Sequence, residues 1–286
     1  MLLIAGSVIV ILSVLGGYAA MGGKLYVLWQ PFEVVIICGA ALGAFVIANP
    51  LKVVKKAGKA MGIAFKGSTY GKESYLELLS LLYLTFKLAK SKGMLALESH
   101  IENPKESSLF QQFPTFLKHE ENVTFLCDYL RMLTLGTDNP HEVETLMDAE
   151  LETHHHEHHQ ISHAIQTVAD SMPALGIVAA VLGVIKTMGS ISEPPEVLGK
   201  LIGGALVGTF LGVWLAYGFI GPIANAVKAA HEADMKYLQC IKAGILAHMQ
   251  GYPPQVSVEF ARKALLSNTR PTFYEVEEAT SRLLPV

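Results

Sequence analysis

Charged side chains are scarce in this sequence. Aspartate, glutamate, lysine and arginine make up 16% of the 286 residues, whereas an ordinary soluble domain carries about 25%. Hydrophobic residues make up 51%, and the net charge of −3 leaves no excess of basic side chains for binding nucleic acid. The composition therefore argues against a soluble domain or a nucleic-acid-binding protein and predicts a membrane protein.

Cysteine is also sparse, and no cleavable leader is recognisable. Cys38, Cys127 and Cys240 lie far apart in the chain and follow no metal-ligand spacing. Three thiols cannot all pair within one chain, so we expect reduced, buried side chains that act as small hydrophobic groups. The first apolar run begins at Met1 without a basic leader or a convincing cleavage site. We expect it to remain as a membrane helix.

Long apolar runs, in contrast, are present four times. A helix needs about 20 apolar residues to cross about 30 Å of hydrocarbon. The two pairs of runs are each joined by a short connector, the first with Tyr26 and Trp29 and the second with Pro194 and Pro195, which cannot continue a helix. The four expected spans are residues 2–21, 32–49, 172–191 and 201–227.

The distribution of lysine predicts how these spans are oriented. Positive charges accumulate on the cytoplasmic side of membrane helices. The two connectors hold only Lys24 and Lys200, whereas the segment after the second span is rich in lysine, at positions 52, 55, 56, 59 and 66. We therefore expect the middle region, the tail and both termini in the cytoplasm.

The middle region has the periodicity of helices and no alternating strand pattern. Two apolar helical patterns end at Gly93 and Gly136. Asn139, followed by Pro140 and Glu142, is a typical helix start. No glycine or proline follows until Pro173, so a helix of about 30 residues, about 45 Å long, is predicted to run into the third span.

Pro173 has two structural interpretations. If Asp170 caps a new helix, Pro173 lies in its first turn, where the missing N–H costs little. If the helix instead continues from the middle region, Pro173 removes one backbone hydrogen bond and kinks it. Pro222 is expected to close the fourth span as Pro173 opens the third.

Small residues form a stripe along the fourth span. Gly204, Gly208 and Gly212 recur every four residues, which is typical of a helix face that packs closely against another helix. Thr209 lies beside this stripe. A membrane threonine usually bonds the backbone of its own helix, so by itself it indicates a polar path only weakly.

Acidic residues are almost missing from the spans. A proton or cation path through hydrocarbon normally uses a buried carboxylate or histidine. The spans hold only Glu33 at one edge and Lys186 near an outer end, and we expect both side chains to reach the membrane interface. If the protein conducts ions, a partner must supply the carboxylate.

Catalytic and metal motifs are absent or incomplete. The run HHHEHHQISH, residues 154–163, offers the i, i+4 spacing that a transition metal can bridge. The metalloprotease pattern fails because Gln160 stands where a histidine is needed. We interpret the run as solvated, with adventitious metal affinity. Without a phosphate loop, nucleophile elbow or catalytic dyad, we expect no enzyme and no cofactor.

The order of these segments resembles the MotA family of flagellar stator proteins. The similarity extends over nearly the whole chain, with two spans, a helical domain, two more spans and a basic tail. The matching segments, in order, are GGYAAMGGKLYVLWQPFEVVIICGAALGAFV, IENPKES, SMPALGIVAAVLGV, ALVGTFLGVWLAYGFIGP and GYPPQVSVEFARKALLSNTRP.

The resemblance implies an all-α, polytopic membrane protein with four transmembrane helices and a helical cytoplasmic domain in the bacterial inner membrane. The ranges implied are a transmembrane hairpin at 1–50, the cytoplasmic domain at 51–170, a hairpin lining the ion path at 171–227 and a cytoplasmic tail at 228–286. In the family, five MotA chains surround two MotB chains, whose helices supply the missing aspartate. Inward proton flow then drives torque on the rotor protein FliG.

Site residues carry over by position. Pro173 and Pro222 match two family prolines that couple ion occupancy to movement of the cytoplasmic domain. Glu98 matches the acidic rotor-contact position, while Lys90 stands where the family often has arginine, so the contact is looser or shared with Lys92. Without the resemblance, this charged group is typical of a solvated helix end or of a docking surface. Glu150 matches an acidic position of less certain role.

The coupling ion follows from Ala180. Sodium-driven relatives have a threonine at this position, whose hydroxyl helps to replace water around a cation. Ala180 has no hydroxyl, so we predict proton coupling, with Thr209 as the remaining hydroxyl near the path. The alternatives are an ExbB- or TolQ-like energiser of an outer-membrane process, whose chains usually have one span before the cytoplasmic domain, and a metal-responsive scaffold built on residues 154–159.

Overall fold

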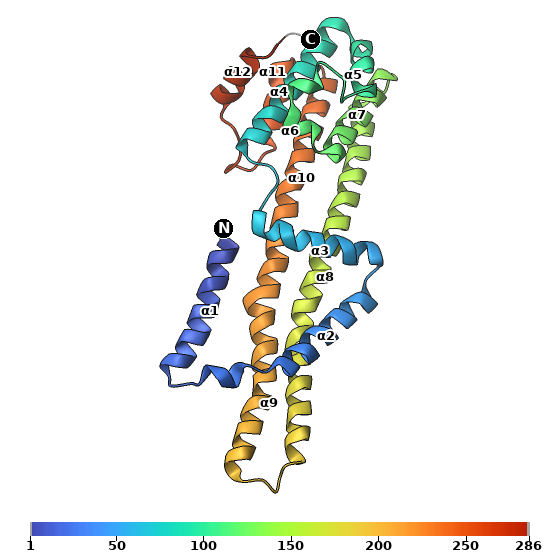
Figure 1. Cartoon of the computed structure of the whole chain (residues 1–286). Coiled ribbons are helices and arrows are strands. Elements are labelled where there is room, and N and C mark those ends of the chain that lie inside the picture. The colour runs from blue at the N-terminus through green and yellow to red at the C-terminus, as the bar shows by residue number, and fades with distance from the viewer. Residues whose placement is uncertain (1, 285–286) are drawn as a thin grey trace. The chain divides into compact units, whose positions relative to one another are not determined.

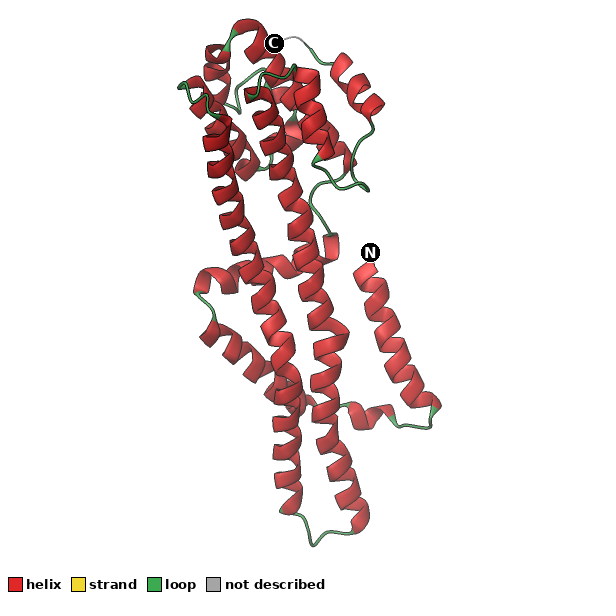
Figure 2. Cartoon of the chain, turned by 180° about the vertical axis from the view of Figure 1, so that it is seen from behind, coloured by secondary structure: helices red, strands yellow, loops and turns green. Residues whose placement is uncertain are grey.

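The computed structural model describes residues 2–284, with every side chain between them except those of Ile63 and Lys66. Helices and loops make up this described part, and it contains no strand (Figure 2). The helical elements, labelled in Figure 1, are α1 (Leu2–Ala20), η1 (Leu25–Leu28), α2 (Pro31–Ala48), α3 (Leu51–Lys66), α4 (Lys72–Lys92), η2 (Met94–Leu97), α5 (Glu98–Glu102), η3 (Phe110–Gln112), α6 (Pro114–Leu117), α7 (Glu120–Thr134), α8 (Pro140–Met188), α9 (Pro195–Leu215), η4 (Ala216–Ile220), α10 (Gly221–Met249), α11 (Pro254–Lys263) and α12 (Phe273–Ser281). The all-α prediction is confirmed.

Contacts divide the chain into two compact units. The first comprises residues 1–67 and 157–230, and the second comprises residues 68–156 and 231–286. The helices α8 and α10 each begin in one unit and end in the other. These units describe packing, whereas the four ranges expected from the sequence describe membrane topology, so those ranges stay a prediction.

Among the described residues, four helical segments are long and apolar enough to cross a membrane, as expected. They are Leu2–Ala20, Leu25–Ala48, Pro140–Met188 and Pro195–Met249. The helix predicted to run from Pro140 into the third span is confirmed, because α8 is continuous over 49 residues and contains Pro173. Asp170 therefore does not begin a new helix. Its carboxylate instead accepts a hydrogen bond of 2.8 Å from the Gln166 side chain one turn earlier.

The helix of the fourth expected span does not end at Pro222. The helical path continues through η4 and α10 to Met249, with Pro222 as the second residue of α10. The element η4 is a π turn, in which the Gly221 N–H donates to the Ala216 carbonyl five residues back. This wider turn directly before the proline accommodates its ring and its missing N–H, so the helix does not end there.

In the first unit, α3 packs against α8 and α10. Ala57, Ala60 and Ala64 form a buried face of α3, and this face belongs to an apolar cluster with Ile161, Ile165, Ala224 and Val227. Beside this cluster, the Glu157 carboxylate of α8 forms ion pairs with Lys52 at 3.2 Å and with Lys56 at 2.9 Å. Small side chains on α3 allow this close approach, while two lysines hold it electrostatically.

In the second unit, α4 is the central helix of the core. Its buried residues include Tyr75, Leu78 and Phe86, and it packs against α11, α12 and η2. The predicted helix ends are confirmed, because Gly93 and Gly136 follow α4 and α7 with φ of 86° and 95°, a conformation that glycine adopts readily. Cys127 and Cys240 are buried, Cys38 is half-buried, and all three are free thiols.

The start of α8 also follows the prediction. The Asn139 side-chain oxygen accepts a hydrogen bond of 3.1 Å from the His141 N–H, and its amide donates to Glu142 at 2.8 Å. The helix therefore begins at Pro140 with its first turn capped by a side chain.

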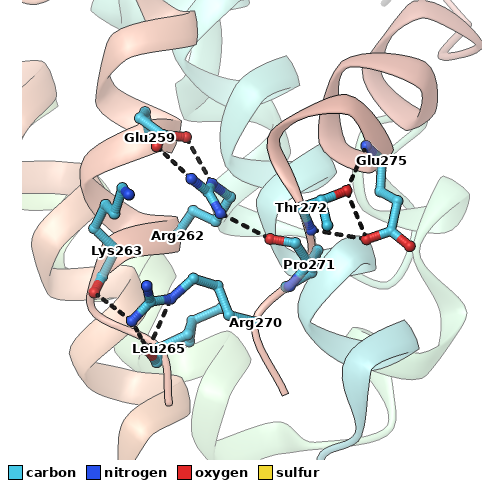
Figure 3. A network of polar contacts seen from close by, with 8 residues as sticks. All are labelled: Glu259, Arg262, Lys263, Leu265, Arg270, Pro271, Thr272 and Glu275. Carbon is cyan, nitrogen blue, oxygen red and sulfur yellow. Dashed lines mark hydrogen bonds and ion pairs between the residues drawn. The ribbon is translucent and has the colours of Figure 1, made fainter. Parts of the chain in front are cut away.

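Charged residues organise the C-terminal tail within the second unit (Figure 3). Buried Arg262 pairs through two nitrogens with Glu259 at 2.5 and 2.7 Å and donates to the Pro271 carbonyl at 2.9 Å. Thr272 and Glu275 form a capping box at the start of α12. Lys72 of α4 contacts Glu275 at 2.7 Å, so these pairs hold α11, the following loop and α12 against the core. Residues 285–286 of the predicted tail lie outside the described residues.

Candidate ion path and coupling site

The helices α8 and α9 approach each other at backbone distance. They form the two arms of a hairpin in Figures 1 and 2. A Cβ atom added at Gly176 of α8 would lie 2.8 Å from the Gly208 carbonyl oxygen, and one added at Gly212 of α9 would lie 2.6 Å from the Met172 oxygen. Neither position has room for a side chain. The predicted role of the glycine stripe in close packing is confirmed.

Ala180 and Thr209 lie at the same level of this hairpin. Ala180 is only 9% exposed, and its backbone nitrogen would be 3.0 Å from a Cβ atom at Gly208, the residue next to Thr209. Thr209 is half-buried. The structure therefore brings the two predicted ion-path residues close together. A larger side chain at position 180 would have to fit into the contact between α8 and α9.

Glu33 is the residue that differs most from expectation. We expected its carboxylate at the membrane interface, but the side chain is only 9% exposed. A Cβ atom added at Gly183 of α8 would contact Oε1 of Glu33, and a Cβ atom added at Gly208 of α9 would contact Oε2. Lys186, for which we had the same expectation, is exposed. The interfacial expectation was wrong for Glu33 because it ignored the gap that two glycines leave between α8 and α9.

The prolines occupy a second level of the same helices. A Cβ atom at Gly221 would lie 4.0 Å from the Cβ of Ala169. Pro173 follows Ala169 by about one turn, and Pro222 follows Gly221 directly. Pro173 and Pro222 therefore flank one level of the α8–α10 pair, next to the π turn. At this level each helix contains a proline, which has no backbone N–H to donate.

The charged group expected at the rotor lies at one end of α4. Lys90 and Lys92 occupy its last turn, and Glu98 is the first residue of α5. All three are exposed, while Leu88, just before Lys90, and Leu97, just before Glu98, are buried. The segment through Gly93 and η2 thus presents two positive charges and one negative charge at the surface, and the buried leucines hold it against the core.

His100 lies close to this charged group. Burial, together with the positive charge of Lys92, lowers the pKa of His100 below its ordinary value. Its Nδ1 lies 2.8 Å from the Ser107 hydroxyl. His100 is therefore neutral at physiological pH and contributes a polar anchor rather than a third positive charge.

Glu150 belongs to a different group of side chains. One oxygen accepts a hydrogen bond of 2.7 Å from the Tyr129 hydroxyl of α7, and the other lies 3.8 Å from His154. His154 also contacts Glu121 at 2.9 Å. Glu150 therefore connects α7 to α8. None of these contacts involves Lys90, Lys92 or Glu98.

The histidine run is distributed around α8. His154 contacts Glu121 and Glu150, and the rings of His159 and His163 stack with centroids 6.0 Å apart. Among the described residues, no group of three histidine, cysteine, aspartate or glutamate side chains is placed to hold a metal ion.

Comparison with known proteins agrees with the resemblance. The Motility protein A N-terminal family matches residues 4–93, and the MotA/TolQ/ExbB proton channel family matches residues 118–239. The first match covers both N-terminal spans and favours a motility protein over the ExbB- or TolQ-like alternative.

Individual relatives match over nearly the full length. A Motility protein A of Salmonella typhimurium is 45% identical over 278 residues, which cover 97% of this chain and 94% of the relative. Among solved structures, MotAB of C. jejuni has a TM-score of 0.77 at 23% identity and covers 94% of this chain and 98% of its own. The flagellar MotAB stator complex of Bacillus subtilis has a TM-score of 0.68 at 24% identity and covers 90% and 92%. The chain therefore belongs to the motility protein A family of MotA/TolQ/ExbB proton channel proteins.

Proposed function

We propose that this chain is the ion-conducting stator subunit of a bacterial flagellar motor, where it works with MotB to couple inward proton flow to torque on the rotor protein FliG. The observation that carries the proposal is the similarity to a motility protein A across 97% of the chain, through both membrane hairpins and the intervening helices. The protein is a multi-pass inner-membrane protein with both termini in the cytoplasm, and it needs no enzyme activity and no cofactor.

MotB is the partner that supplies the ion-binding aspartate. The two solved structures described above are named as MotAB. In the proposed assembly, five copies of this chain surround a MotB dimer, with residues 171–227 lining the ion path. The lysines of residues 52–59 favour the cytoplasmic placement of α3 and of the residues that follow.

The mechanism depends on the charge of the aspartate. A protonated carboxyl is neutral and an empty one is charged, so proton binding changes which contacts it prefers. In this proposal, the ring of third and fourth spans steps around MotB when that charge changes. Ala180 and Thr209 lie where the spans meet, and Pro173 and Pro222 transmit the movement toward Lys90, Lys92 and Glu98 at the rotor. Glu150 holds α7 to α8 while the helices move.

Complementation tests this proposal. The chain and its candidate MotB are expressed together in cells lacking their own stator proteins, and the rotation of tethered cells is recorded. We expect rotation only when both proteins are present. An assembled complex that produces no rotation would contradict the motor assignment. Replacing the histidines of residues 154–159 by alanine should leave rotation intact, whereas a metal-responsive scaffold would lose its response to metal.

A further inference from the structure

A buried carboxylate remains unexplained by the roles assigned so far. Glu33 lies in the first turn of α2, is only 9% exposed, and its Oε2 has no hydrogen-bond partner among the described residues. Burying a charged carboxylate without a partner is costly. A proton or a cation on Glu33 removes this cost, and ionisable side chains within membrane helices usually mark a path for ions or protons.

The surroundings of Glu33 are shaped to receive its carboxyl group. A Cβ atom at Gly208 would collide with Oε2, and one at Gly183 would lie 3.4 Å from Oε1. The two glycines belong to different helices, α9 and α8, so the carboxyl group of α2 occupies a gap between them. Any other residue at position 208 would displace it.

The position of this gap links it to the ion path. Gly208 also lies against the backbone of Ala180 and directly precedes Thr209 in the chain. The carboxyl group of Glu33 is therefore at the same level as the two residues assigned to the path. Two other acids at the hairpin ends, Glu193 and Glu196, are exposed and lack such an enclosure.

We propose that Glu33 is a second proton-binding carboxyl group of the ion path, supplied by this chain in addition to the aspartate of MotB. This inference rests on the proposed function, because it assumes that the assembled complex conducts protons. A passing proton binds at Oε2 and leaves from the same atom, so the site alternates between the neutral acid and the carboxylate. Glycine at positions 183 and 208 keeps the space that this exchange needs.

Proton flux is the first test. Complexes of this chain with MotB are reconstituted in liposomes, and acidification of the lumen is followed under an imposed potential. Glu33→Gln, which keeps the shape but cannot exchange a proton, should lower the flux by about tenfold or more. Glu33→Asp should retain part of the flux. Glu106→Gln, a matched change at an exposed acid outside residues 171–227, should leave the flux unchanged.

Carbodiimide labelling gives a second readout that does not depend on flux. A protonated carboxyl in apolar surroundings adds across one C=N bond of dicyclohexylcarbodiimide, so its proton moves to nitrogen and its oxygen bonds to carbon. Rearrangement then leaves a stable N-acylurea that contains all the atoms of both reactants. Mass spectrometry should find this adduct on Glu33, with less adduct as the pH rises, and none on Glu196.

The outcomes separate the two proposals. If the unaltered complex conducts no protons, the proposed function fails. If that complex conducts and Glu33→Gln conducts equally well at equal assembly, Glu33 is a structural carboxyl group and this inference is overturned, even if the adduct forms. A reduced flux in Glu33→Gln together with the Glu33 adduct in the unaltered chain supports it.

Discussion

At Gly208 one missing side chain allows three helices to meet. A Cβ atom there would collide with Glu33 of α2 and lie 3.0 Å from the backbone nitrogen of Ala180 in α8. Gly208→Ala should therefore overpack the contact and destabilise the assembled complex by about 1–3 kcal/mol. Gly203→Ala is the matched control in the same helix, because a Cβ atom at Gly203 meets nothing within 4 Å. Thermal dissociation of the purified complex measures both, and equal midpoints would contradict the packing described.

Glu98 gives the second test at the level of single residues. Its side chain is exposed, so reversing its charge should not disturb folding. Glu98→Lys should abolish swimming while the complex still assembles with MotB, because the electrostatic match to the rotor is reversed. Glu106→Lys, a reversal at another exposed acid of the same unit, should still swim. Loss of assembly in Glu98→Lys would instead show that Glu98 has a structural role.

Single residues also show what the sequence predicts well. The stops at Gly93 and Gly136 and the cap at Asn139 are local features, so nearby residues suffice to predict them. The burial of Glu33 depends on glycines at positions 183 and 208, which come from distant parts of the chain. In the sequence, the only indication of this burial is an acidic residue within an apolar run. The same pattern is equally consistent with a side chain at the membrane interface.

Among the elements, α12 is held to α4 by a carboxylate that responds to acid. Hydrogen bonds from Lys72, and then from Thr272, lower the pKa of Glu275 from 4.5 to about 2. A lowered pKa in the folded state means that the stabilisation is complete above pH 4.5 and is lost as the pH falls from 4.5 toward 2. Protection of α12 amides from hydrogen exchange, corrected for the intrinsic pH dependence of exchange, should fall over this range.

The matched variant for this prediction is Glu275→Gln. It should show weaker protection of α12 at pH 7, because it lacks the charge that pairs with Lys72. Its corrected protection should not change between pH 4.5 and 2. An unaltered chain with equally constant protection would contradict the role given to the Lys72–Glu275 pair.

The long helices show where element boundaries follow from sequence and where they do not. The absence of glycine and proline between Pro140 and Pro173 correctly predicted a continuous α8. The continuation of the helix past Pro222 was not predicted, because the residues before it showed no sign of the π turn at 216–220. Ala216, the first residue of this turn, is fully buried.

For the whole molecule, family and fold class could be predicted because the segments occur in a characteristic order with long apolar runs. The predicted coupling ion rests on one side chain, Ala180, which is buried against α9 and has no hydroxyl. Neither pentamer nor MotB contacts follow from a single chain, since both depend on surfaces that other chains complete.

The most direct test of the account is the rotation speed of tethered cells that carry only this chain and its MotB, with sodium varied at constant proton-motive force. The account predicts rotation whose speed does not change with sodium. A speed that rises with sodium would contradict proton coupling and the argument from Ala180, and the absence of rotation by a verified, assembled complex would contradict the stator function itself.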